Sequence, residues 1–287
     1  MSTVVIRFSS LGDIVLAGAV TGHLAPVIFV TLERYAEVAK RLPGVVEVRT
    51  WEEHGRAALR GASRIVDLHA SLRSRYATAF QKPVVQRVRR HDLKRRFRVA
   101  FKSSPAPMVI DRYAEAAQVP IAATPWFSQA AGKELILIPG AQHKTKRWTV
   151  QQWISLGKHW EGPIAVIGSQ IEASVVHEIA TGIGAHARPI SEQGFEETFQ
   201  VIQTAGLAVG GDTGLMHLAA ASGVPVVCLF GPTRPEDGHW CHSGPVVQVE
   251  LACRPCSRHG GDTCPMGDHA CMRSIQVDDV LTAMEQL

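Results

Sequence analysis

The chain has 287 residues, 46% of them hydrophobic, and this length can bury the cores of two ordinary domains. No stretch approaches the roughly 18 uninterrupted apolar residues of a membrane span. The N-terminus lacks a basic, apolar leader, and six cysteines are too few for a secreted disulfide scaffold. We therefore expect a folded cytoplasmic protein with reduced thiols.

The formal net charge of +4 conceals two unlike halves. Residues 1–130 hold 20 basic and 10 acidic side chains, whereas residues 131–287 hold 10 and 16. The first half is expected to meet something anionic, which could be nucleic acid, a phosphorylated glycolipid or an anionic membrane leaflet.

Strand and helix patterns alternate through the first half. Apolar runs rich in β-branched residues predict strands at 3–8, 25–31, 45–51 and 64–70, and the spacing of apolar residues predicts helices at 14–24, 32–42 and 109–118. The segment from Arg87 to Arg98 is basic, with seven Lys or Arg residues and one Asp. This alternation predicts a parallel sheet covered on both faces.

Residues 119–133 carry two prolines and no clear periodicity, so we expect an interdomain linker there. The alternation then restarts. Strands are predicted at 134–140, 162–169 and 224–232, helices at 149–160, 171–183 and 197–206, and a strand, turn and helix within 207–223. Two Rossmann-like lobes are predicted, spanning residues 1–127 and 128–287.

Three polar clusters follow predicted strands, where ligands bind in open α/β sheets. They are SSLGD, PGAQHKTKRW and GGDTGLMH. The last places Asp212 and Thr213 at a helix start, where free N–H groups and the helix dipole favour a phosphate. His217 lies one helical turn beyond Thr213. The alternative is that Asp212 is only an N-cap and His217 a packed helix residue.

The other two clusters also allow two interpretations. Lys144, Lys146 and Arg147 could neutralise a diphosphate leaving group, or could belong to a solvated basic loop. Asp13 could accept a proton from an attacking hydroxyl, or could cap the first helix.

Together these clusters resemble the pattern of glycosyltransferase family 9, the ADP-heptose:lipopolysaccharide heptosyltransferases. The resemblance covers essentially the whole chain and runs through VIRFSSLGDIVLAGAV, VDLHASLRSR, HDLKRRFRV, PGAQHKTKRW, VIGSQIEAS, GDTGLMHLAAASGVPVVCLFGPTRP and CPMGDHACMRSI. It implies a GT-B fold, with an N-terminal acceptor lobe, a C-terminal donor lobe and a cleft that closes over both substrates. The last helix is expected either to stay on the second lobe or to pack back on the first.

The resemblance also implies an inverting transfer of heptose from a nucleotide sugar, ADP-heptose, to an anionic lipopolysaccharide core acceptor. Asp13 is then the catalytic base. The implied donor-binding residues are Lys146, Glu172, Asp212, Thr213, Gly214 and His217. The implied acceptor-binding residues are Ser10, Arg73 and Arg75, with the Arg87 to Arg98 run.

The same resemblance implies that no metal or other cofactor is required. The expected partners are the nucleotide-sugar donor and an anionic glycolipid acceptor, lipid A carrying Kdo. Peripheral contact with the cytoplasmic face of the inner membrane would fit this acceptor. Nucleic acid is not an expected partner, and the chain is expected to be a monomer.

The cysteine-rich segment allows a further interpretation. Cys253, Cys256, Cys264 and Cys271 could form a tetrathiolate zinc site, although their spacing fits a zinc ribbon poorly. A packed loop of reduced thiols is the interpretation we favour.

Four alternatives to heptose transfer remain open at this stage. A transferase of the same fold could use another nucleotide sugar, and a GT-B-fold epimerase would need no acceptor. A nucleic-acid-binding protein would explain the basic half, and a relative without activity would only bind sugar nucleotides.

Overall fold

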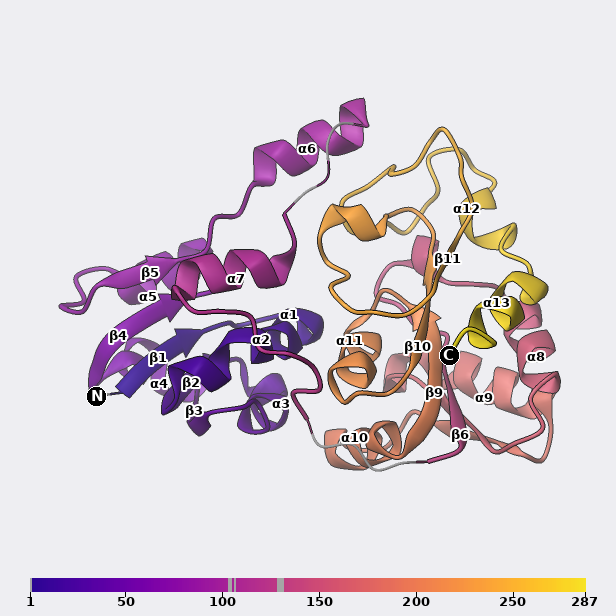
Figure 1. Cartoon of the computed structure of the whole chain (residues 1–287), viewed down its shortest axis with the longest axis horizontal. Helices are drawn as coiled ribbons and strands as arrows, with labels where there is room; N and C mark the ends of the chain where they lie inside the picture. The colour runs from indigo at the N-terminus through magenta and orange to yellow at the C-terminus, as the bar shows by residue number, and fades with distance from the viewer. Residues whose placement is uncertain (1, 103–104, 106, 128–131) are drawn as a thin grey trace. The chain divides into compact units, whose positions relative to one another are not determined.

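The chain folds into two compact units (Figure 1). This computed structural model describes residues 2–102, 105, 107–127 and 132–287, without the side chains of residues 92–96. The first unit comprises residues 1–91 and 107–127, and the second comprises residues 92–106 and 128–287. The boundary after residue 127 coincides with the expected one, but residues 92–106 group with the second unit rather than the first.

A parallel sheet with the strand order β3-β2-β1-β4-β5 forms the centre of the first unit. Its strands are β1 (Ser2–Ile6), β2 (Val27–Thr31), β3 (Val45–Thr50), β4 (Ala62–Asp67) and β5 (Val85–Arg87). Every residue of β2 is buried, which suits a sheet covered on both faces. β5 was not predicted, because it is a three-residue edge strand with no fully buried residue.

Helices flank this sheet. They are α1 (Leu11–Leu16), α2 (Gly18–Thr21), α3 (Ala36–Lys40), α4 (Trp51–His54), α5 (Leu72–Thr78) and α7 (Val109–Ala117). The prediction of one helix over 14–24 was wrong, because Ser10 and Asp13 form a capping box that starts α1 earlier. The helical path then divides at Ala17.

The first part of the predicted linker packs on the first unit. The ring of Trp126 lies so close to Gly18 that a Cβ there would be 2.9 Å from it. The main-chain N–H of Ala122 donates to the oxygen of Ala19 at 2.8 Å. Residues 119–127 are therefore held by α2 rather than free.

The sheet of the second unit is also parallel, with the order β11-β10-β9-β6-β7-β8. Its strands are β6 (Glu134–Ile138), β7 (Ile164–Ile167), β8 (Ala187–Ile190), β9 (Ala205–Gly211), β10 (Val226–Phe230) and β11 (Val246–Gln248). The edge strands β8 and β11 were missed because they are short and only partly buried. β9 begins within the helix predicted at 197–206, which ends at Gln203.

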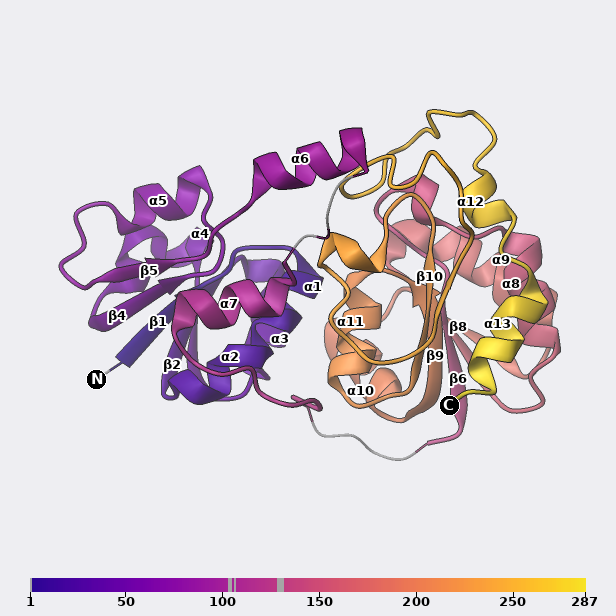
Figure 2. The ribbon, with the colours of Figure 1, turned by 45° about the horizontal axis from the view of Figure 1, so that its top comes forward.

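The helices of the second unit are α6 (Asp92–Phe101), α8 (Val150–Lys158), α9 (Ala173–Ile183), α10 (Phe195–Gln203), α11 (Gly214–Ala221), α12 (Ala270–Arg273) and α13 (Val277–Met284). Of these, α10 and α11 cover one face of the sheet, and α8 and α9 cover the other (Figure 2). No helix in the described part of the chain is long and apolar enough to cross a membrane.

The last helix, α13, belongs to the core of the second unit. Val280 and Ala283 pack in the same cluster as Trp153 of α8. Figure 1 shows α13 beside α8, and Trp148 Nε1 donates to the oxygen of Ile275 at 3.1 Å. α13 is therefore an integral part of the second unit.

Candidate active site

The carboxyl ends of β6 and β9 form the topological switch point of the second sheet. β6 leads through β7 to β8 on one side, and β9 leads through β10 to β11 on the other. Ligands of open parallel sheets bind beyond the strand ends at such a point. The clusters PGAQHKTKRW and GGDTGLMH follow these two strands, so the fold brings them together.

Lys146, Asp212 and His217 form one connected group at this point. Lys146 Nζ lies 2.9 Å from Asp212 Oδ2 and also donates to the main-chain oxygen of Asp212. His217 Nε2 lies 3.2 Å from Asp212 Oδ1. None of these side chains is more than 12% exposed. Three residues expected to bind the donor thus lie in direct contact.

The electrostatics of this group keep Asp212 ionised. Burial alone would raise the pKa of the Asp212 carboxyl, but the Lys146 ammonium and the hydrogen bond from His217 outweigh burial and hold that pKa well below its usual range. Asp212 therefore stays an anionic partner of Lys146 and fixes the position of the Lys146 ammonium. The N–H of this ammonium that does not donate to Asp212 can donate to a ligand.

Thr213 is the N-cap of α11, so the alternative that made Asp212 the N-cap is wrong. The Thr213 hydroxyl oxygen is buried and has no hydrogen-bond partner among the described residues. The first N–H groups of a helix also lack partners within the helix. Thr213 and Gly214 thus offer unsatisfied donors beside Lys146, an arrangement that suits a phosphate.

Gly210 allows α11 to approach the sheet closely. A Cβ at Gly210 would lie 2.7 Å from Met216 Sδ and 2.9 Å from Ile138 Cβ. The helix N-terminus is therefore positioned by contacts that only glycine permits.

Two residues of this site, Trp240 and His242, were missed in the sequence analysis. His217 Nδ1 lies 3.0 Å from His242 Nε2, and the Trp240 and His242 ring centroids are 5.1 Å apart. These residues lie in an irregular segment without periodicity, so the aromatic and histidine pair in HWCHS was the only available signal.

His242 should decrease the free energy of unfolding as the pH becomes acidic. Burial, and then the neighbouring His217, lower the pKa of His242 to about 3. An unfolded histidine has a pKa of about 6.5. As the pH falls below that value, the unfolded chain binds a proton that the folded chain refuses, so the free energy of unfolding decreases. We expect His242→Gln to flatten this decrease between pH 6.5 and pH 4 in urea titrations.

The matched control for this experiment is His159→Gln, which replaces an exposed histidine at the end of α8. This control should keep the wild-type slope. An unchanged slope in His242→Gln would show that His242 does not contribute to acid sensitivity.

Glu172 lies in the same unit, after β7. Its Oε2 accepts hydrogen bonds from the Ser169 main chain at 2.9 Å and from the Ser169 hydroxyl at 2.7 Å. Its Oε1 lies 3.8 Å from Arg147 and closely approaches Gly140, the glycine that follows β6. The capping box fixes the carboxylate, which leaves Oε1 facing the loop that follows β6.

Gly140→Ala should displace this carboxylate. The added Cβ would overlap the Glu172 carboxylate, which is the flexible end of a side chain, so stability should change little. If Glu172 contacts the ribose of the donor, we expect ADP affinity to fall by about tenfold in calorimetry, the value of one hydrogen bond to a charged group.

Gly261→Ala is the control, because a Cβ at Gly261 makes only an ordinary 3.7 Å contact. Equal ADP affinity in both variants would mean that Glu172 acts only as a helix cap.

In the first unit, the switch point lies between β1 and β4. The loop after β1 leads into α1 and carries Ser10 and Asp13. Asp13 Oδ2 accepts from the Ser10 main chain at 3.2 Å and from the Ser10 hydroxyl at 2.8 Å. Asp13 is thus the third helical residue rather than the N-cap, and the expected acceptor residue Ser10 takes that role.

Arg7 is a further residue of this site that the sequence analysis missed. Arg7 Nη2 lies 2.5 Å from Asp13 Oδ2, and Arg7 Nη1 donates to the oxygen of Leu68 at 2.6 Å. Burial would lower the pKa of Arg7, but Asp13 and Tyr113 outweigh burial and raise it. The ion pair with Arg7 and the two hydrogen bonds from Ser10 hold the Asp13 carboxylate in a fixed position.

The loop after β4 places His69 and α5 beside the same switch point. The Phe8 ring lies 5.2 Å from His69 and 5.7 Å from the guanidinium carbon of Arg73. Burial, and then Arg7, lower the pKa of His69 to about 4, so His69 is neutral at pH 7. Arg73 and Arg75 are exposed on α5, where both can meet a ligand.

The basic run from Arg87 to Arg98 does not act as one exposed surface. Arg87 Nε pairs with the fully buried carboxylate of Asp67 at 2.7 Å. Arg98 is only 7% exposed and pairs with Asp237 of the second unit at 2.6 Å. The three cationic residues at 94–96 are among those whose side chains the structure does not describe. Arg87 and Arg98 are therefore committed to ion pairs within the fold.

The cysteines are free thiols. Burial, and then neighbouring cysteines, raise the pKa of Cys256, and they raise the pKa of Cys271 to about 11. The described residues contain no group of three or more His, Cys, Asp or Glu side chains placed to hold a metal ion. Cys253 and Cys264 contribute to the raised pKa of both Cys256 and Cys271, so the four thiols of the cysteine-rich segment lie near one another.

Two parallel α/β units, each with polar groups beyond its strand ends, define a GT-B type protein. Residues 48–266 match the model of glycosyltransferase family 9 (heptosyltransferase), and the chain belongs to this family.

Solved structures share the fold over almost their whole length. An E. coli ADP-heptose lipopolysaccharide heptosyltransferase II has a TM-score of 0.76 at 20% identity, with coverage of 100% of this chain and 98% of that one. A family 9 glycosyltransferase from Veillonella parvula has a TM-score of 0.76 at 16% identity, with coverage of 99% and 96%.

Curated relatives match a shorter part of the chain. Lipooligosaccharide heptosyltransferase 2 of Campylobacter jejuni is 27% identical over 167 residues, 54% of this chain and 51% of the relative. Lipopolysaccharide heptosyltransferase 1 of Pseudomonas aeruginosa is 30% identical over 128 residues, 42% of this chain and 36% of the relative. The matched region thus spans about half the length of the first of these relatives.

Proposed function

We propose that the chain is an inverting glycosyltransferase that moves a heptose from ADP-heptose to an anionic lipopolysaccharide core acceptor. The observation that carries this proposal is the Lys146–Asp212–His217 group beside the N-terminus of α11 in a family 9 chain. A related E. coli heptosyltransferase, with a TM-score of 0.70, was solved with ADP. No metal or other cofactor is part of this proposal.

The donor diphosphate would bind at the start of α11. Lys146 supplies a positive charge, and Thr213 and Gly214 supply N–H and hydroxyl donors. These groups are fixed before the reaction, so they can stabilise the negative charge that grows as the diphosphate leaves. Asp212 and His217 position the ammonium of Lys146, and Glu172 would contact the ribose.

Asp13 would deprotonate the attacking acceptor hydroxyl. Its carboxylate is ion-paired with Arg7, and its side chain is 20% exposed, so a substrate can reach it. Ser10, Arg73 and Arg75 would bind anionic groups of the acceptor. Asp13 and the diphosphate-binding group belong to different units, so transfer needs both.

The proposed setting is the cytoplasm, with a monomeric enzyme in peripheral contact with an anionic membrane that carries the glycolipid. The support is a surface on the first unit formed by α5 and the segment that follows it. Leu72 is 87% exposed and Phe80 is 98% exposed. Residues 71–91 contain six Lys or Arg residues and no Asp or Glu, which matches an anionic lipid surface.

Phe80→Ser should reduce sedimentation of the chain with vesicles containing phosphatidylglycerol, because the exposed ring can no longer enter the lipid interface. The control is Val46→Ser, which changes a 70% exposed residue in β3, at the opposite edge of the same sheet. Equal losses in both variants would contradict a specific membrane-facing surface.

Calorimetric titration with ADP, UDP and GDP tests the donor. Selective binding of ADP, followed by turnover of ADP-heptose with a Kdo-lipid A acceptor, supports the proposal. A preference for UDP or GDP would change the sugar nucleotide, and consumption of donor without acceptor would indicate an epimerase. Failure to bind any of the three nucleotides would indicate that the chain is a family relative without transferase activity.

A further inference from the structure

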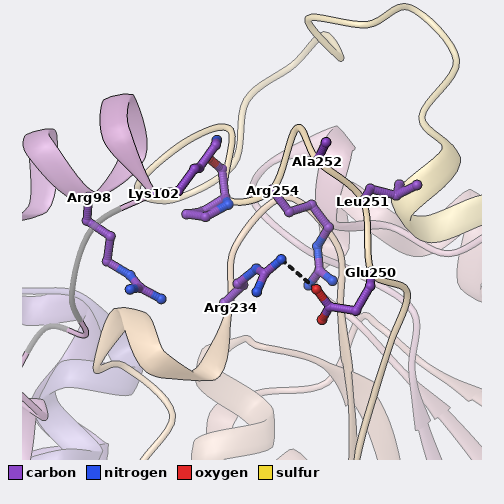
Figure 3. A pocket seen from close by; sticks show the side chains of 8 residues that line it. Arg98, Lys102, Arg234, Glu250, Leu251, Ala252 and Arg254 are labelled. Atoms are coloured by element: carbon purple, nitrogen blue, oxygen red, sulfur yellow. Dashed lines mark hydrogen bonds and ion pairs between the residues drawn. The ribbon is translucent and has the colours of Figure 1, made fainter.

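A cavity of about 410 Å³ opens in the second unit, and none of the residues assigned to the donor is among those that line it (Figure 3). Lys102 follows α6 on one side, and the segments that follow β10 and β11 form the other. Its lining includes four cationic side chains and one carboxylate. They are Arg98, Lys102, Arg234, Arg254 and Glu250.

Two of these cations have carboxylate partners. Arg98 Nε lies 2.6 Å from Asp237 Oδ1, and a second carboxylate, that of Glu236, lies 3.8 Å from Arg98 Nη2. Arg234 Nη2 lies 2.8 Å from Glu250 Oε2, the pair drawn with a dashed line in Figure 3. The carboxylates of Asp237, Glu236 and Glu250 are thus already paired with Arg98 or Arg234.

Lys102 and Arg254 instead donate to neutral oxygens. Lys102 Nζ donates to the main-chain oxygen of Cys253 at 2.9 Å and to that of Pro255. Arg254 is only 2% exposed. Its acceptors are the main-chain oxygens of Phe230, Gly231, Thr233 and Val249 and the side-chain oxygen of Gln248.

Burial is the main reason why the pKa of Arg254 is lowered, and repulsion from Arg234 adds to it, against an opposing contribution from Glu250. A buried cation without a contacting anion costs free energy. An anion in the cavity would reduce that cost. Arg234 Nε, also buried, has no hydrogen-bond partner among the described residues and is a further donor.

We propose that this cavity is a binding site for a phosphomonoester. A phosphomonoester carries a charge of about −1.5 to −2 at pH 7, which the two cations without contacting carboxylates would balance. Arginine and lysine are the side chains that bind such groups best. The volume lies in the range of small-molecule sites, so it admits a phosphate together with part of the group that bears it.

The phosphomonoester could belong to a free metabolite or to the headgroup of a glycolipid. The second source rests on the proposed function, because it makes the cavity part of acceptor recognition. The chemistry that the cavity recognises is the same in both cases.

The first test is calorimetric titration of the full chain with inorganic phosphate in a phosphate-free buffer. Lys102→Gln removes one charge at an exposed position, and we expect it to weaken phosphate binding by about tenfold or more. Arg234→Gln should act in the same direction. Lys158→Gln, which changes an exposed lysine of α8, should bind like the wild type, and thermal unfolding checks that each variant is folded.

Lys146→Ala separates this cavity from the start of α11, where phosphate could also bind. Retention of phosphate binding in Lys146→Ala, together with its loss in Lys102→Gln, supports the cavity. The reverse pattern would overturn the proposal, since the phosphate would then occupy the donor site.

Vesicles distinguish the two sources. A Lys102-dependent preference for phosphatidic acid over phosphatidylglycerol would identify a phosphomonoester headgroup, whereas binding of inorganic phosphate without that preference would identify a free ligand. Absence of both kinds of Lys102-dependent binding would overturn the proposal. Neither measurement needs ADP or sugar transfer, so the cavity and the proposed function can fail separately.

Discussion

Lys146→Ala should weaken ADP binding by about tenfold to a hundredfold and lower the transfer rate as well. The Lys146 side chain is 12% exposed and its ammonium is held by Asp212, so its charge would reach the diphosphate with little screening. A hydrogen bond to a charged group contributes about 1.5–3 kcal/mol. Calorimetry gives the affinity, and steady-state kinetics with ADP-heptose gives the rate.

The same substitution should reduce the free energy of unfolding by about 3 kcal/mol, because it leaves the Asp212 carboxylate buried without its cation. Urea titration measures this loss. The control is Lys144→Ala, on the same turn but exposed, which should change neither quantity. ADP affinity that stays at the wild-type value in Lys146→Ala would remove Lys146 from the donor site.

Asp13→Asn should lower kcat by about a hundredfold to ten-thousandfold, the usual contribution of a general base, while ADP affinity stays within a few fold. Asparagine keeps an oxygen that can accept from Ser10, so the start of α1 should survive. The substitution removes the negative charge beside Arg7 and with it the proton acceptor.

Ser10→Ala provides the comparison for Asp13→Asn. It removes the hydroxyl that donates to Asp13 and that would contact the acceptor, but it keeps the carboxylate, so kcat should fall far less than in Asp13→Asn while the KM for the acceptor rises. If transfer by Asp13→Asn survives within a few fold, the carboxylate serves only the capping box and the pairing with Arg7.

The positions of the main strands along the chain could be predicted from the sequence because each buried strand is a continuous apolar run. Val27–Thr31 and Val226–Phe230 are buried at every position and were both predicted. The short edge strands, such as Ala187–Ile190, have mixed burial and no clear periodicity. Edge strands satisfy fewer packing constraints, so their sequences carry a weaker signal.

The resemblance to family 9 implied that Lys146, Asp212 and His217 would serve one site, whereas the residues alone left a helix cap and a solvated basic loop as alternatives. Their direct contacts depend on β6 and β9 being neighbours, which the tertiary structure establishes. Trp240 and His242 reach this site from an irregular loop, and no local pattern could place them there.

The basic character of residues 1–130 was evident from composition, but composition could not separate exposed cations from paired ones. Arg73 and Arg75 remain exposed on α5, whereas Arg98 is buried against Asp237, 139 positions further along the chain. Local sequence determines which segments form strands and helices, because backbone propensity and apolar spacing act over a few residues. Only the tertiary structure decides which charges are paired, because ion pairs join residues that chain folding brings together from distant positions.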